Sequence, residues 1–125
     1  MDEKTTNLWN SHAVVEKPWG QYTDIYRSPS VVFKKIDITP GEEISYQYHS
    51  SRQEFWYISS GQGFMTVEGS GVEVRAGDCF HIKEGERHGI ENSGDLRLTI
   101  FEIQCGDCRE EDIVRLTDKY NRDEK

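Results

Sequence analysis

Short apolar segments divided by turn residues make up most of the chain. Glycine-rich turns, such as Gly61-Gln62-Gly63 and Gly69-Ser70-Gly71, separate several of these segments and predict hairpins. The expected strands are Val14–Val15, Tyr22–Tyr26, Val31–Ile38, Ile44–His49, Glu54–Ser59, Phe64–Val67, Val72–Val74, Phe80–Ile82, Gly89–Asn92 and Leu96–Gln104. Many short strands at regular spacing indicate an all-β sandwich or barrel.

The end of the chain departs from this pattern. Between Glu110 and Tyr120, apolar residues recur at helical spacing and acidic residues come first, where they favour the helix dipole. We therefore expect one short C-terminal helix packed on the barrel. The candidate core residues are Val15, Trp19, Ile36, Ile58, Phe64, Val72, Phe80, Ile82, Leu98 and Ile100.

Length and charge limit the possible classes. A chain of 125 residues forms one domain, which we place at residues 14–122, with an N-terminal extension (1–13) and a short tail (123–125). The net charge of −8 argues against a nucleic-acid partner or an anionic membrane, because either needs a basic face. An anionic small molecule would need a local cluster of cations. The available ones are Lys17, Lys34, Lys35, Arg52, Arg115 and Arg122, although each alone is more often a solvated surface charge.

The N-terminus has no apolar stretch of the kind a signal peptide needs, and no segment approaches the roughly 20 apolar residues of a membrane span. We therefore expect a cytoplasmic protein, in which Cys79, Cys105 and Cys108 stay reduced. Cys105 and Cys108 form a C-x-x-C pair, which could indicate redox chemistry or half of a zinc site. The alternative is a turn that carries two incidental thiols.

The segment from Gly41 to Gly61 contains three possible metal ligands. Gln47 and His49 are two residues apart, so in a strand their side chains point to the same side. Glu54 follows after a short polar stretch, Ser50 to Gln53, which we expect to form a hairpin turn that returns Glu54 beside the first two ligands.

A fourth possible ligand, His88, follows a turn that contains Gly85. Two imidazoles and a carboxylate, with the amide oxygen of Gln47, suit a divalent transition metal and leave room for water or substrate. Each histidine could instead be an ordinary partly buried side chain; it is the joint spacing of the four residues that favours a metal.

These residues carry a family resemblance. Gly41–Gly61 resembles the first cupin motif, with Gln47 in place of its first histidine, and Gly77–Asn92 resembles the second, with Lys83 in place of its proline. The Q-x-H-x2-R-x-E-x-W pattern of residues 47–56 is similar to the type II phosphomannose isomerase domain, the C-terminal domain of bifunctional mannose-1-phosphate guanylyltransferases. Further segments that resemble this family are Lys17–Tyr22, Phe101–Gln104, Asp112–Arg115 and Asp118–Arg122.

The resemblance implies a cupin double-stranded β-helix, or jelly-roll barrel, and interconversion of mannose 6-phosphate and fructose 6-phosphate or a related sugar phosphate. The implied cofactor is a divalent metal, zinc in the first place, with cobalt, manganese or nickel as alternatives. Glu102 matches a family glutamate and is the candidate acid/base, unless it is a structural carboxylate paired with an arginine such as Arg115. The candidate substrate-binding residues are Arg52, Arg115, Arg122 and Trp56, and Trp56 could equally be plain core.

Two departures from the family bear on the substrate. Phe55 stands where a histidine is usual, and Gly89 where an arginine is common, and we expect both changes to remove polar groups near the metal. The competing functions are a non-catalytic metal- and sugar-binding cupin module and a metal-dependent oxygenase, although Gln47 in place of a histidine argues against the latter. Cupins often pair through sheet edges, so the resemblance also makes a homodimer an expectation.

Overall fold

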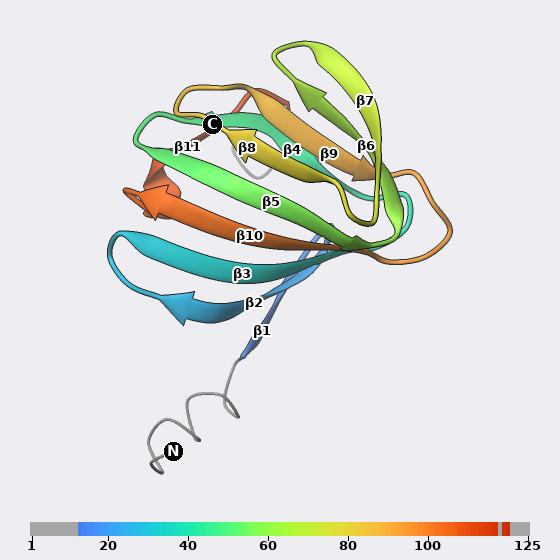
Figure 1. Ribbon diagram of the computed structural model, residues 1–125, viewed down its shortest axis with the longest axis horizontal. Coiled ribbons are helices and arrows are strands. Elements are labelled where there is room, and N and C mark those ends of the chain that lie inside the picture. Colours follow the sequence, from blue (N-terminus) through green and yellow to red (C-terminus); the bar gives the residue numbers. More distant parts are fainter. Residues whose placement is uncertain (1–12, 118, 121–125) are drawn as a thin grey trace.

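The computed structural model describes residues 13–117, 119 and 120, and it is built almost entirely of β-strands (Figure 1). The elements are β1 (Val14–Lys17), β2 (Gly20–Arg27), β3 (Val31–Ile38), β4 (Glu43–His49), β5 (Arg52–Ser60), β6 (Gln62–Val67), β7 (Ser70–Arg75), β8 (Cys79–Ile82), β9 (His88–Asn92), β10 (Leu98–Gly106), η1 (Glu110–Asp112) and β11 (Ile113–Arg115). The predicted all-β class is confirmed. Within the described ranges, no helix has the length and apolar character needed to cross a membrane.

The strands form two antiparallel sheets that face each other. One sheet has six strands in the order β1-β2-β3-β10-β5-β8, and the other has five in the order β11-β4-β9-β6-β7. Along β5, residues alternate between buried and more exposed positions, as expected for a strand with one face on the core. The inward faces of the two sheets therefore enclose the hydrophobic core and, at one end, a group of polar side chains.

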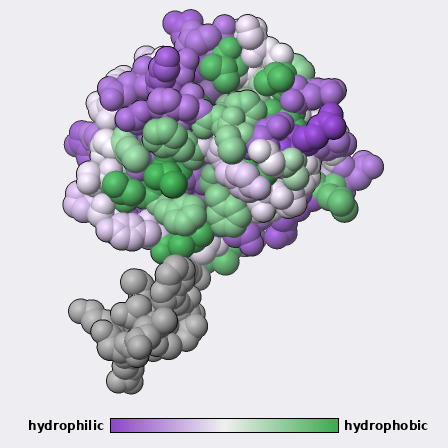
Figure 2. All heavy atoms as spheres, viewed as in Figure 1, coloured by the Kyte–Doolittle hydropathy of each residue, from purple (hydrophilic) through white to green (hydrophobic). Residues whose placement is uncertain are grey.

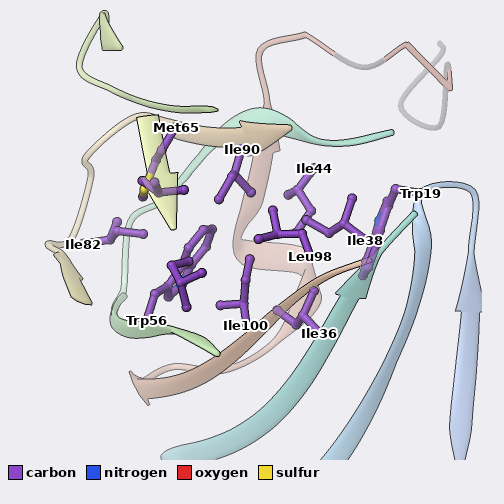
Figure 3. Close-up of a cluster of buried hydrophobic side chains, with 12 residues drawn as sticks. Trp19, Ile36, Ile38, Ile44, Trp56, Met65, Ile82, Ile90, Leu98 and Ile100 are labelled. Carbon is purple, nitrogen blue, oxygen red and sulfur yellow. The ribbon is translucent and has the colours of Figure 1, made fainter. Parts of the chain in front are cut away.

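Twelve buried apolar residues fill the space between the sheets (Figure 3). Of the ten predicted core residues, six are buried there: Trp19, Ile36, Ile58, Ile82, Leu98 and Ile100. Phe80 packs against this cluster and is partly buried, whereas Val15 is only half-buried and lies outside it.

Two of the predicted core residues are wrong. Phe64 is 40% exposed, because alternation along β6 turns its neighbour Met65 inward instead. Val72 is 47% exposed, because the inward face of the edge strand β7 is covered at Val74, which is 1% exposed, but not at Val72. Met65 and Val74 take the corresponding core positions.

The predicted C-terminal helix is also wrong. After a single 3-10 turn at Glu110–Asp112, the chain forms β11, which pairs antiparallel with β4 and places Arg115 opposite Gln47. The backbone bonds continue past β11, where the Leu116 N–H donates to the carbonyl of Tyr46 at 2.8 Å. The edge of β4 provides hydrogen-bond partners for these backbone groups. A helix here would leave the edge of β4 unpaired, so the strand is favoured over the weak helical pattern.

Replacing Leu98 by alanine should lower the free energy of unfolding by about 2–5 kcal/mol, since it leaves a cavity at a fully buried position between the sheets. Leu96→Ala is the matched control, because Leu96 is 75% exposed two residues earlier, and we expect a change within about 0.5 kcal/mol. Urea denaturation measures both values. Equal losses in the two variants would contradict the placement of Leu98 in the core.

Candidate metal centre

Two histidines and a glutamate lie together at the polar end of the interior. His49, Glu54 and His88 are 2%, 1% and 0% exposed, and one ligand atom from each lies within 4.8 Å of the others. His49 Nδ1 is 3.5 Å from Glu54 Oε2, and His88 Nε2 is 3.8 Å from Glu54 Oε1. Such a donor set can hold a divalent metal ion.

The three ligands come from both sheets. His49 ends β4 and His88 begins β9, which are neighbours in the five-stranded sheet, whereas Glu54 projects inward from β5 in the six-stranded sheet. The expected hairpin between β4 and β5 is therefore wrong, because β5 pairs with β10 and β8. The link through Ser50 and Ser51 carries the chain from one sheet to the other, and Glu54 reaches His49 across the interior.

Both imidazoles are neutral, and that of His88 is oriented for coordination. His88 Nδ1 lies 2.9 Å from the carbonyl oxygen of Glu86, so this nitrogen donates its hydrogen and the lone pair lies on Nε2. Nε2 is buried without a hydrogen-bond partner. Burial lowers the pKa of His88, and burial followed by the charge of Arg52 lowers the pKa of His49 to about 2. An unprotonated, unpartnered imidazole nitrogen beside a carboxylate fits a metal ion.

Gln47 lies beside this cluster but presents its nitrogen to it. Its Nε2 is 3.1 Å from His49 Nε2, and its Oε1 accepts a hydrogen bond from the Ser45 hydroxyl at 3.0 Å. A half-turn of the Gln47 amide would exchange Oε1 and Nε2, so that the oxygen faces the cluster. The hydroxyl of Ser45 could then accept a hydrogen bond from Nε2 instead of donating one to Oε1. Gln47 can therefore serve as the fourth ligand only in this second orientation.

Arg52 and Trp56 hold Glu54 in place. Arg52 Nε donates to Glu54 Oε2 at 2.9 Å, and Trp56 Nε1 donates to Glu54 Oε1 at 3.0 Å. Both side chains are almost fully buried, at 2% and 3% exposed. Arg52 thus contacts a metal-ligand candidate directly, and Trp56 belongs both to the hydrophobic core and to the wall of the site.

Glu102 is joined to the same tryptophan. Its Oε2 accepts from Trp56 Nε1 at 3.1 Å, and its Oε1 accepts from Gln104 Nε2 at 2.7 Å. Burial, followed by the negative charge of Glu54, raises the pKa of Glu102 to about 8. The sheet thus places a second carboxyl group next to the metal-ligand candidate.

A cavity of about 80 Å³ adjoins the cluster. Gln47, Trp56 and Glu102 line it, and so do four cationic side chains: Lys17, Lys34, Arg52 and Arg115. This gathering of positive charge contrasts with the net charge of −8. Arg115, predicted from the family resemblance, therefore lies at the cavity, while Arg122 falls outside the described residues.

Lys34 was counted among the available cations but not chosen as a site residue, because a lone lysine is usually a solvated surface charge. Lys34 is 6% exposed, and its Nζ lies 4.2 Å from the centroid of the Tyr22 ring. Lys34 shares the inward face of β3 with Val32 and Ile36, which are both buried. A lysine at an inward position of a predicted strand was the signal that could have identified it.

Phe55 and Gly89, the two departures from the family, face away from the metal cluster. The prediction that they remove polar groups near the metal is therefore wrong. Phe55 is 41% exposed on the outer face of β5, and a side chain at Gly89 would meet the backbone of Tyr46 at 3.1 Å. Successive residues of a strand point to opposite faces, so the neighbours of the inward-facing Glu54 and His88 must face outward.

The three cysteines are free thiols outside the metal-ligand cluster found among the described residues. Cys108 is buried, its Sγ donates to the carbonyl of Gln104 at 3.7 Å, and burial raises its pKa. These features agree with a turn that carries incidental thiols.

The mannose-6-phosphate isomerase C-terminal family matches residues 4–118. The chain belongs to this family. It is 36% identical over 113 residues to the mannose-1-phosphate guanylyltransferase of Salmonella montevideo, a match that covers 90% of this chain and 24% of that protein. The chain therefore spans about a quarter of the length of such curated relatives.

Solved structures establish the cupin fold. A double-stranded β-helix protein from Klebsiella pneumoniae matches with a TM-score of 0.68 and 22% identity, over 77% of this chain and 83% of that chain. The capsular polysaccharide assembling protein CapF from Staphylococcus aureus matches with a TM-score of 0.73 and 19% identity, over 86% and 34%. The predicted double-stranded β-helix is confirmed, without the C-terminal helix.

Proposed function

We propose that this domain is a metal-dependent isomerase that interconverts mannose 6-phosphate and fructose 6-phosphate. The observation that carries the proposal is the pairing of Glu54 and Glu102 on one Trp56 indole, which sets a carboxyl group beside a metal-ligand cluster in a cation-lined cavity. Membership of the mannose-6-phosphate isomerase C-terminal family supports the choice of substrate.

His49, Glu54 and His88 would hold the metal, with Gln47 as the fourth ligand once its amide is turned. We propose zinc, for which cobalt, manganese or nickel could substitute in this set of nitrogen and oxygen donors. The bound cation would polarise the sugar carbonyl and make the neighbouring C–H bond acidic. Arg52 and Trp56 would keep the Glu54 carboxylate aimed at it.

Glu102 is the proposed acid/base. In the open-chain aldose, the ionised form of Glu102, which is the minor form below its pKa of about 8, would take the proton from C2, which gives an enediol once O1 gains a proton. The same carboxyl group would return the proton to C1 while O2 loses its own, and the product is the ketose. Such a positioned group typically contributes about 10²–10⁴-fold to the rate.

The phosphate group would lie at the cationic side of the cavity. Arg115 offers a planar guanidinium suited to bidentate contact with phosphate, and Lys17 and Lys34 add positive charge near the Tyr22 ring. Arg52 already donates to Glu54, so we assign it to the carboxylate rather than to the phosphate.

A coupled assay of fructose 6-phosphate formation tests the proposal on protein loaded in turn with zinc, cobalt, manganese and nickel. We expect turnover only with bound metal, and a large preference for mannose 6-phosphate over unphosphorylated mannose. Stoichiometric metal binding and sugar-phosphate binding without turnover would overturn the isomerase and favour a non-catalytic binding module.

A metal-dependent oxygenase is the second candidate, because two histidines and one carboxylate are also the donor set of non-haem iron oxygenases. The cationic cavity and the family membership favour the isomerase. Oxygen consumption by the iron-loaded protein, together with no isomerisation, would reverse this ranking.

A further inference from the structure

Ser45 is a buried hydroxyl residue with no role in the proposed mechanism. It lies on the inward face of β4 with Gln47 and His49, each two residues from the next, and it is 1% exposed. The six-stranded sheet covers this row from the opposite side, and Figure 2 shows hydrophobic side chains gathered over the outer surface of β3, β5 and β10. The hydroxyl of Ser45 is therefore shielded from bulk water, so its hydrogen-bond partners must come from the interior.

A β-bulge in β4 aims Ser45 at the metal cluster. Between Ile44 and Gln47, β4 has one more residue than the paired stretch of β9. Because of the bulge, Ile44 and Ser45 are both buried although they are neighbours in the sequence. Gly89 lies opposite, where a Cβ atom would be only 3.1 Å from the Cα atom of Tyr46. The bulge thus lets Ile44 remain in the core while Ser45 faces the amide of Gln47.

The orientation of the Gln47 amide covers a ligand atom of His49. The Ser45 hydroxyl donates to Gln47 Oε1 at 3.0 Å, and Gln47 Nε2 lies 3.1 Å from His49 Nε2. An amide nitrogen can only donate, so His49 Nε2 uses its lone pair for this hydrogen bond. A metal ion would need the same lone pair. In this orientation, Gln47 therefore competes with a metal ion for His49.

The reversed orientation of the amide depends on the hydroxyl at position 45. A half-turn would aim Gln47 Oε1 at the cluster and Nε2 at Ser45. A hydroxyl can accept there as well as donate, whereas an apolar side chain would leave a buried N–H without a partner. The terminal torsion of a glutamine has a broad, two-fold preference, so the rotation itself costs little. One rotation would thus uncover His49 and supply the fourth ligand.

We propose that Ser45 is a positioning residue of the metal centre, which supports the Gln47 amide in one orientation that covers His49 and in another that coordinates the ion. Metal binding would then reverse the hydrogen bond between Ser45 and Gln47, because the hydroxyl donates before the ion binds and accepts afterwards. The inference rests on the metal centre of the proposed function, but it does not depend on isomerase turnover.

NMR spectroscopy of the wild-type chain tests this reversal directly. Without metal, the side-chain amide hydrogens of Gln47 should show nuclear Overhauser effects to the ring hydrogens of His49. With one equivalent of zinc, these effects should be replaced by effects to the β-hydrogens of Ser45. Zinc binding that leaves the contacts to His49 unchanged would overturn the proposal and leave the metal centre standing, whereas a wild-type chain that binds no zinc would overturn both.

Replacing Ser45 by alanine should lower zinc affinity by about 10–100-fold, the loss typical of groups that support a metal ligand. The change weighs mainly on the metal-bound form, because a buried N–H without an acceptor is less tolerated than a carbonyl without a donor. Ser45→Thr restores the hydroxyl and should recover the affinity, and Ser60→Ala, at an exposed position of β5, is the matched control. Chelator competition measures all three variants, and wild-type affinity in Ser45→Ala would overturn the proposal.

Discussion

Replacing His88 by alanine should abolish stoichiometric metal binding and, with it, isomerase turnover. His88 is fully buried, and its Nε2 is the imidazole nitrogen that the fold leaves without a hydrogen-bond partner beside Glu54. Its loss removes a ligand outright, so we expect metal affinity to fall by more than the roughly 10–100-fold typical of residues that only support a ligand. Elemental analysis of the purified variant and chelator competition measure the change.

His81→Ala is the matched control, since His81 is exposed on the outer face of β8. This variant should keep the metal content of the wild-type protein. If His88→Ala retains one tightly bound metal per chain, the cluster of His49, Glu54 and His88 is not the metal site, and the coordination proposed for the isomerase must be abandoned.

Replacing Glu102 by glutamine should lower kcat by about 10²–10⁴-fold and leave metal content unchanged. Glutamine has nearly the volume of glutamate, and its amide oxygen can still accept the hydrogen bond from Trp56. A half-turn of the Gln104 amide lets Gln104 Oε1 accept from the new N–H, so the packing of the site is preserved. The lost function is then proton transfer alone. Steady-state kinetics with mannose 6-phosphate, on the metal-loaded variant, measure kcat and KM separately.

Glu91→Gln serves as the control, because it makes the same exchange at an exposed position of β9 and should not change kcat. A Glu102→Gln enzyme with wild-type kcat would show that Glu102 is a structural carboxylate. A higher KM with unchanged kcat would instead assign it to substrate binding.

The candidate ligands could be chosen from the sequence even though one of the reasons was wrong. Gln47 and His49 do share the inward face of β4, as their separation of two residues requires. Glu54 reaches them from the opposite sheet rather than through a hairpin. Local spacing fixes which face of a strand a side chain takes, but it carries no information on which strand pairs with which.

The lack of information on strand pairing also explains the wrongly predicted C-terminal helix. Residues 113–115 were expected in a helix because their own spacing allowed it, while the free edge of β4 that captures them is formed nearly 70 residues earlier in the chain. The expectation for Phe55 and Gly89 failed for a different reason: nearness to a ligand in sequence was taken as nearness in space. Alternation along β5 and β9 was sufficient to place both on the outer faces.

Because the candidate ligands come from both sheets, metal binding requires that the two sheets are packed together. A cation held by His49, His88 and Glu54 would act as a cross-link between the sheets, and neither sheet alone could bind it. Free metal at 1,000 times its dissociation constant would add about 4 kcal/mol to the stability of the folded state. The domain would then resist proteases better with metal bound than without it. In a cell short of the ion, the less stable metal-free protein would be degraded, so the protein would be lost as well as its activity.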